Sequence, residues 1–224
     1  MANPPFQKPK ITAAFKKRIL KDWQTCLPGL TIDPPLCLTR RVGTLLIFVG
    51  FGISRGSDCY ETAFGVHNLS APLDFLTSTL NERQLGLITV RAHEKGDYVE
   101  AAERMKAQAL LPLQGPITLS MIIEAYQRHA LKKFALRSQH SFQDPALIAA
   151  WAGKEDLARE MIEWGLTGIS QWPKEGQERL GGLLGWYKDM EARIADPQKL
   201  RQTVEEQVIF HKLTHIPGEE LIID

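Results

Sequence analysis

The sequence predicts an α+β protein, in which an antiparallel β-sheet with an N-terminal helix is followed by a mostly helical C-terminal half. The first observation is a change of character at Pro112–Pro116, because strand and turn patterns dominate before this segment and helical patterns after it. The second is an apolar stripe that recurs every four residues near the N-terminus, as on one helix face. The stripe consists of Ile11, Phe15, Ile19 and Trp23. We expect a sheet-containing part, residues 1–112, and a helical part, residues 113–224, which together could form one continuous domain.

The first part begins with a predicted helix over residues 11–25 and continues as strands. Two apolar segments, Leu36–Arg41 and Thr44–Ile53, are predicted strands joined by a tight connection. The small, polar residues of Ser54–Asp58 are typical of a turn. They predict a hairpin whose returning strand is Cys59–Asn68.

Two further segments complete a predicted sheet of about four or five strands, a common sheet size. Leu73–Leu80 is compatible with a helix or a strand. We predict a strand because Phe75, Thr77 and Thr79 favour a pleated surface. Leu87–His93 is predicted to be another strand.

The remainder of the chain predicts helices with apolar stripes and recognisable ends. Asp144-Pro145 and Asp196-Pro197 indicate helix starts, because Asp caps free amides and Pro is tolerated in the first turn. Gly181 and Gly182 fall inside one predicted helix, where each glycine costs about 1 kcal/mol relative to alanine. We therefore expect another helix to approach closely at this point. The predicted helices are Asp97–Leu110, Thr118–Phe134, Pro145–Ala152, Lys154–Gly165, Glu175–Ala195 and a last one ending near Leu213.

Composition is that of an ordinary globular protein, with 224 residues, 44% of them hydrophobic and 24% charged. The net charge of +1 provides no strong field toward nucleic acid or an anionic membrane, so we expect neither as a partner. The longest apolar run, Val42–Ile53, is shorter than the roughly 20 residues that cross a bilayer. Charge is uneven, since residues 1–112 carry 14 basic and 10 acidic residues and residues 113–224 carry 13 and 16.

Cysteine usage and the N-terminus predict a cytoplasmic protein. The three cysteines, Cys26, Cys37 and Cys59, are odd in number and contain no CxxC spacing, so reduced thiols are expected. The polar, proline-rich segment Met1–Lys10 does not have the pattern of a signal peptide. We expect no bound cofactor.

The positions of several histidines are compatible with metal binding or acid–base catalysis, but none of these patterns forms a complete metal or catalytic site. His211 and His215 stand four residues apart, on one face of the last predicted helix, a spacing that can place two imidazoles on one metal. No third ligand is evident, and packed histidines are favoured. We expect no catalytic residue and no metal site. The open alternative is a small cytoplasmic enzyme, in which His67, His93 and Glu94 would converge in a cleft.

Two groups of polar residues are the predicted partner contacts. Asp156, Glu160 and Glu163 recur at i, i+4 and i+7, so they share one helix face, where like charges cost a few tenths of a kcal/mol per pair. This face is either simply solvated or meets a basic partner. The predicted hairpin tip is the second candidate, because exposed loops on a rigid scaffold often carry binding. Its residues are Arg55, Asp58 and Glu61.

The segment Pro34–Pro72 combines an apolar strand, a polar turn and a strand that carries a Tyr and ends in V-H-x-L. A predicted helix precedes it, and a helical region with the sequence AWAGKEDLAREMIEW lies further along the chain. This order of elements resembles the small cytoplasmic immunity proteins with which bacteria neutralise toxins used against their neighbours. The resemblance implies tight binding to one cognate toxin, often by blocking its active site, and no catalytic residues. We therefore expect an immunity protein, and an adaptor or structural subunit is the remaining non-enzymatic alternative.

Overall fold

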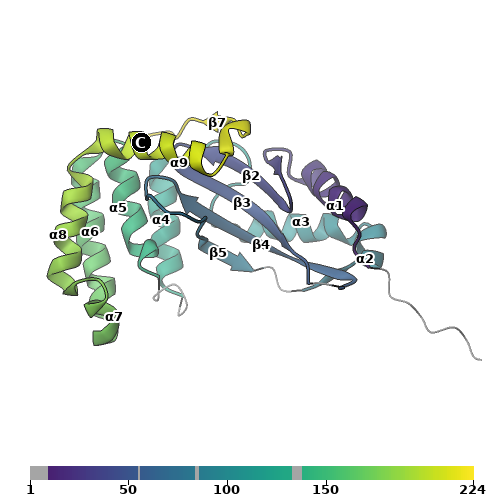
Figure 1. Ribbon diagram of the computed structural model, residues 1–224, viewed down its shortest axis with the longest axis horizontal. Coiled ribbons are helices and arrows are strands. Elements are labelled where there is room, and N and C mark those ends of the chain that lie inside the picture. The colour runs from purple at the N-terminus through teal and green to yellow at the C-terminus, as the bar shows by residue number, and fades with distance from the viewer. Residues whose placement is uncertain (1–9, 55, 84–85, 133–137) are drawn as a thin grey trace, which may run out of the picture.

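The computed structural model describes residues 10–54, 56–83, 86–132 and 138–224 (Figure 1). It confirms the α+β class, with helix α1 (Ala13–Cys26) before a β-sheet and a mostly helical second half after it.

The sheet has seven strands, two more than the upper end of the prediction. Five of them lie in the order β1-β2-β3-β4-β5 and are antiparallel. The two additional strands are short: β6 pairs with β4, and β7 runs parallel to β2. The strands are β1 (Thr31–Asp33), β2 (Cys37–Val42), β3 (Leu45–Gly52), β4 (Cys59–Asn68), β5 (Thr79–Arg83), β6 (Ile88–Thr89) and β7 (Gly218–Glu219).

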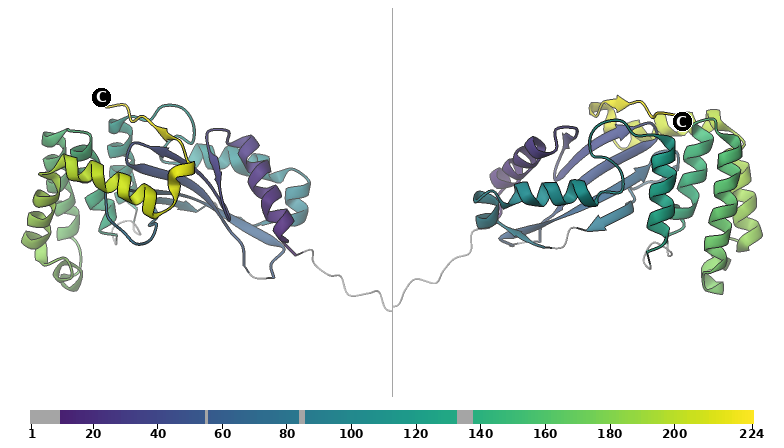
Figure 2. Two further views of the ribbon diagram at one scale, coloured as in Figure 1. Left: turned by 45° about the horizontal axis from the view of Figure 1, so that its top comes forward. Right: turned by 180° about the vertical axis from the view of Figure 1, so that it is seen from behind.

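The predicted hairpin forms the centre of this sheet. β3 and β4 pair without a register shift from Leu45–Asn68 to Gly52–Glu61. Because side chains alternate along a strand, β3 directs every second residue into the main core, namely Leu45, Ile47, Val49 and Phe51. Helix α3 (Asp97–Gln108) lies over this face, as the view from behind shows (Figure 2).

The opposite face of the sheet is covered at one end. There, Leu46 packs with Val204 and Val208 of helix α9 (Pro197–Phe210). Toward the hairpin tip the same face carries small residues, including Gly50, Gly52 and Ala63, which are half-buried or exposed. Within the described part of the chain, no helix covers this end of β3 and β4 (Figure 1).

Helix α5 (His140–Trp151) is the centre of the second half. All ten residues from Ser141 to Ala150 are buried, because α5 is packed against α4, α6, α8 and α9. The helices after the sheet are α2 (Val90–Glu94), α3, α4 (Leu119–Ala130), α5, α6 (Glu155–Ser170), α7 (Lys174–Glu178), α8 (Gly182–Ile194), α9 and the short 3-10 helix η2 (Leu213–His215).

Arg40 on β2 connects the sheet, the predicted seam and the C-terminal strand. Its guanidinium donates to the carbonyls of Pro112 (3.2 Å) and Gly115 (2.9 Å) and to Glu219 Oε1 (3.0 Å) and Oε2. The main apolar core also contains residues from before and after Pro112. A single buried side chain therefore holds the connection between the two predicted parts against the end of the chain.

Two predicted strands are largely wrong. From Leu73–Leu80, only the last two residues belong to a strand, β5. From Leu87–His93, only Ile88 and Thr89 pair in the sheet, and helix α2 follows directly. The second strand ends early because the Thr89 side chain accepts a hydrogen bond from the Ala92 amide and caps α2. The β-propensity of these residues does not reveal this helix start.

One of the two predicted Asp-Pro helix starts is wrong. Asp196 caps α9 through the Lys199 amide (3.0 Å) and confirms its prediction. Asp144, in contrast, lies inside α5, which begins four residues earlier at His140, and Pro145 also lies within the helix. The Asp144 side chain faces partners in the core instead of free amides of its own helix.

The predicted helix Glu175–Ala195 is two helices, α7 and α8. Gly181 and Gly182 both have positive φ angles, 78° and 75°, so they end one helix and start the next. The expected close helix approach occurs at Gly165 of α6 instead, where an added Cβ would lie 2.8 Å from the ring of Trp186.

Candidate functional site

The three predicted carboxylates of helix α6 lie together on its exposed face. Asp156, Glu160 and Glu163 are all exposed, while the opposite face of the helix is buried. The neighbouring Glu155 pairs with Arg159 at 2.5 Å. Among the residues that the structure describes, no cation lies within ion-pair distance of Asp156, Glu160 or Glu163. The structure therefore presents a row of three unpaired negative charges on a rigid helix, which we call the α6 carboxylate row.

The end of β4 at which the predicted hairpin tip begins lies far from α6, at the other end of the molecule (Figure 1). Arg55 is outside the described residues. Asp58 is half-buried, and its carbonyl accepts a hydrogen bond from the Val90 amide at 2.7 Å. Glu61 lines a cavity of about 340 Å³ on the uncovered sheet face, together with Gly50, Gly52 and Ala63. A partner of ordinary interface size would contact one of these two surfaces but not both.

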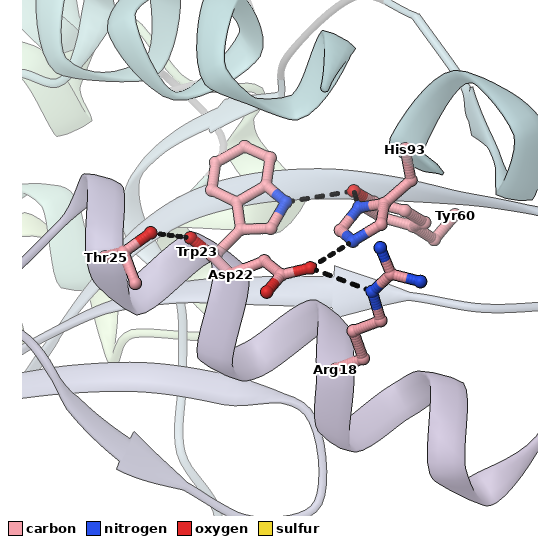
Figure 3. A network of polar contacts seen from close by, with 6 residues as sticks. All are labelled: Arg18, Asp22, Trp23, Thr25, Tyr60 and His93. Carbon is pink, nitrogen blue, oxygen red and sulfur yellow. Dashed lines mark hydrogen bonds and ion pairs between the residues drawn. The ribbon is translucent and has the colours of Figure 1, made fainter. Parts of the chain in front are cut away.

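A buried polar network joins α1, β4 and α2 (Figure 3). His93 Nε2 lies 3.0 Å from Asp22 Oδ2, and His93 Nδ1 lies 2.8 Å from the Tyr60 hydroxyl. The Trp23 indole donates to the same hydroxyl at 2.9 Å, and Arg18 Nε donates to Asp22 Oδ2 at 3.2 Å. Trp23, Tyr60 and His93 are almost completely buried.

The proton positions in this network follow from the donors that are available. Tyr60 accepts from Trp23, so its own proton is directed to His93 Nδ1, and the neutral imidazole donates Nε2–H to Asp22. Burial lowers the pKa of His93, which is opposed by the hydrogen bond to Asp22, and burial raises the pKa of Tyr60. An Asp–His pair beside a hydroxyl is an arrangement that can activate a nucleophile. Here the hydroxyl is enclosed, and neither Tyr60 nor His93 lines the cavities beside β7, α7 and α4 or the cavity on the uncovered sheet face.

A second buried network lies where the sheet meets the helices. Asp144 Oδ1 accepts from the Asn68 amide at 3.3 Å, and Asp144 Oδ2 lies 2.9 Å from the Tyr126 hydroxyl. That hydroxyl lies 2.9 Å from Thr79 Oγ1, which lies 2.9 Å from the carbonyl of Val66. Burial raises the pKa of Asp144 to about 7, although its hydrogen bonds from Tyr126 and Asn68 act in the opposite direction.

The histidines of the enzymatic alternative do not converge. His93 contacts Tyr60, and His67 lies seven positions further along β4, which corresponds to about 23 Å. The unbroken register also places the two contacts on opposite faces of the sheet. Glu94 is exposed on α2.

The other histidines have separate partners. His67 Nδ1 accepts from the Thr77 amide at 3.0 Å, and burial lowers the pKa of His67 to about 4. His211 Nε2 lies 3.1 Å from the carbonyl of Leu73, whereas His215 Nε2 lies 3.3 Å from Asp33 Oδ1. His211 and His215 were expected on one helix, but α9 ends at Phe210. No group of three or more potential metal ligands occurs in the described ranges.

Comparisons with protein-family models, curated proteins and solved structures find no match to this chain. None of the described helices is both long enough and apolar enough to cross a membrane.

Proposed function

We propose that this protein works by binding another protein, and that the partner is a toxin that it neutralises. The α6 carboxylate row is the observation that carries the proposal. The toxin class comes from the resemblance of Pro34–Pro72 to immunity proteins.

The α6 carboxylate row suits a basic partner for electrostatic reasons. Glu160 lies four residues from Asp156 and three from Glu163, so each pair repels its neighbour by a few tenths of a kcal/mol in the free protein. A basic surface removes this repulsion, speeds association and fixes the orientation of the complex. A toxin that cleaves nucleic acid has such a surface in its substrate cleft, because it must hold phosphates.

The position of the row on α6 favours a rigid contact. The helix buries Ala158, Met161, Ile162, Gly165 and Ile169 against its neighbours. Binding therefore orders only the exposed side chains, which keeps the entropic cost of association low. The uncovered sheet face around Glu61 is the second surface, and it would contact the partner if the row does not.

The test is protection of cells from the toxin encoded beside the gene for this chain. We expect the wild-type protein to restore growth and the double variant Glu160→Lys/Glu163→Lys to lose at least tenfold in protection. The matched control is Glu100→Lys/Glu103→Lys on α3, which reverses two exposed glutamates at the same spacing.

Two results would contradict the proposal. Equal protection by both double variants would remove the α6 carboxylate row from the interface. Failure of the wild-type protein to protect, together with a stable complex with a resident cellular protein, would favour an adaptor subunit instead.

A further inference from the structure

A cavity of about 570 Å³ lies at the edge of the sheet, between β7, the C-terminal end of α5 and α9. Figure 1 shows β7 beside β2 and close to α9. Arg41 and Arg201 both line the cavity, together with Trp151. Its size lies within the range of small-molecule sites.

The two arginines have few partners. Nη2 of Arg41 reaches only the carbonyl of Ile216, at 3.4 Å, and its Nε is buried without a partner in the described part of the chain. Arg201 directs Nε and Nη2 to one acceptor, the carbonyl of Trp151, both at 3.4 Å. The adjacent Arg40, in contrast, uses four contacts and pairs with Glu219.

Arg41 and Arg201 face one cavity, and within the ranges that the structure describes the acceptors that their side chains reach are only two backbone carbonyls, each at 3.4 Å. A guanidinium has five N–H donors and binds carboxylates in a two-pronged geometry. No carboxylate of the described residues lies within 4.0 Å of either Arg41 or Arg201. An external carboxylate would supply the missing acceptors, while Glu205 and Glu220, which line the same cavity, balance the two positive charges.

The rest of the lining defines the ligand more narrowly. Glu205 and Glu220 also face the cavity and form no ion pair with a described residue, which disfavours a doubly charged anion and suits a ligand ammonium group. Trp151, Val204, Leu221 and Ile223 supply an apolar wall. The ligand thus combines a carboxylate, an ammonium group and an apolar side chain.

We propose that this cavity binds a small zwitterion, an amino acid of the leucine or phenylalanine type, through its carboxylate on Arg41 and Arg201. The ammonium group contacts Glu205 and Glu220, and the side chain packs against Trp151. This site is separate from the α6 carboxylate row, so binding here does not depend on the proposed toxin.

Isothermal titration calorimetry with L-leucine and three phenylalanine-related probes tests the proposal. We expect saturable binding of L-leucine and L-phenylalanine, weaker binding of 3-phenylpropanoate, which lacks the ammonium group, and no binding of 2-phenylethylamine, which lacks the carboxylate. Arg201→Gln, on the exposed side of α9, should weaken L-phenylalanine binding about ten- to a hundredfold. Glu205→Gln/Glu220→Gln should weaken L-phenylalanine but not 3-phenylpropanoate.

The matched control is Arg104→Gln on α3, which should leave every affinity unchanged. The absence of saturable binding for L-leucine and L-phenylalanine would overturn the proposal, as would an unchanged affinity in Arg201→Gln. Equal affinities for L-phenylalanine and 3-phenylpropanoate would contradict the role of the two glutamates.

Discussion

At the scale of single residues, burial opposes the hydrogen bonds that Asp144 accepts, and burial decides its pKa. Three contacts of 2.9 Å run from Asp144 through Tyr126 and Thr79 to the carbonyl of Val66. Tyr126 donates to Asp144 Oδ2, Asn68 donates to Asp144 Oδ1, and Thr79 Oγ1 donates to the Val66 carbonyl. The hydrogen bonds from Tyr126 and Asn68 favour the ionised carboxylate, but burial outweighs them and raises the pKa of Asp144.

The raised pKa of Asp144 makes stability depend on pH. The folded pKa of Asp144, about 7, lies above the ordinary value of 3.8, so the native state keeps a proton that the unfolded chain loses between these values. Its contribution is therefore complete below about pH 4 and is lost as the pH rises toward 7. Asp144→Asn should remove this loss, about 4 kcal/mol.

Urea unfolding of wild type and Asp144→Asn from pH 4 to 8 measures the difference. His67 contributes in the opposite sense, because its folded pKa of about 4 makes stability fall as the pH drops below about 6.5. Since both proteins contain His67, only the difference between their curves reports on Asp144. Parallel curves would show that Asp144 is ionised in the native state.

The Tyr60 hydroxyl is predicted to stabilise the network around His93. Tyr60→Phe keeps the ring but leaves Trp23 Nε1 and His93 Nδ1 without a partner, at a cost of about 1–3 kcal/mol in the free energy of unfolding. Tyr98→Phe is the control, because Tyr98 stacks on His93 through its ring and should change stability by less than about 0.5 kcal/mol. Equal effects of the two variants would refute the hydrogen-bonding role.

At the scale of elements, the sequence predicts the ends of a helix or strand correctly where contacts between neighbouring residues determine them. The strand Cys59–Asn68 agrees with the structure at both ends, because its alternation and the preceding turn are properties of neighbouring residues. The start of α5 was predicted wrongly because Asp144 is drawn to Asn68 and Tyr126, which are distant in sequence. The same limit hides the buried network around His93, since His93 meets Asp22 across 71 residues without a local pattern.

The break between α7 and α8 allows a test of the wrong helix prediction. Gly182→Ala should destabilise the protein by about 1 kcal/mol or more, because Gly182 has a positive φ angle. Gly185→Ala, within α8, should stabilise it by about 0.5–1 kcal/mol. Thermal unfolding measures the stability of both variants. An increase in stability for Gly182→Ala would contradict the break and favour the uninterrupted helix that the sequence predicts.

At the scale of the whole molecule, Arg40 connects the seam at Pro112–Pro116 with the C-terminus. The change from strand to helix patterns was visible in the sequence, but this connection was not, because Arg40 and Glu219 are 179 residues apart. The predicted partner contacts also lie at two ends of the molecule, a separation that sequence spacing does not reveal (Figure 1).

Removal of the Arg40 contacts should loosen the C-terminal strand. Arg40→Met leaves the carbonyls of Pro112 and Gly115 without their donor and should cost about 2–4 kcal/mol. Hydrogen exchange at the Gly43 amide, which donates to the Glu219 carbonyl at 3.0 Å, should accelerate. The control Arg41→Met loses one 3.4 Å contact and should leave this exchange nearly unchanged.

The association rate with the adjacently encoded toxin tests the central proposal most directly. For wild type we expect a rate that falls steeply with added salt, because unpaired carboxylates on α6 attract a basic surface. Glu160→Lys/Glu163→Lys should slow association at low salt at least tenfold and flatten the salt dependence, while Glu100→Lys/Glu103→Lys keeps both close to wild type. Identical rates and salt dependences for the two double variants would contradict binding through the α6 carboxylate row.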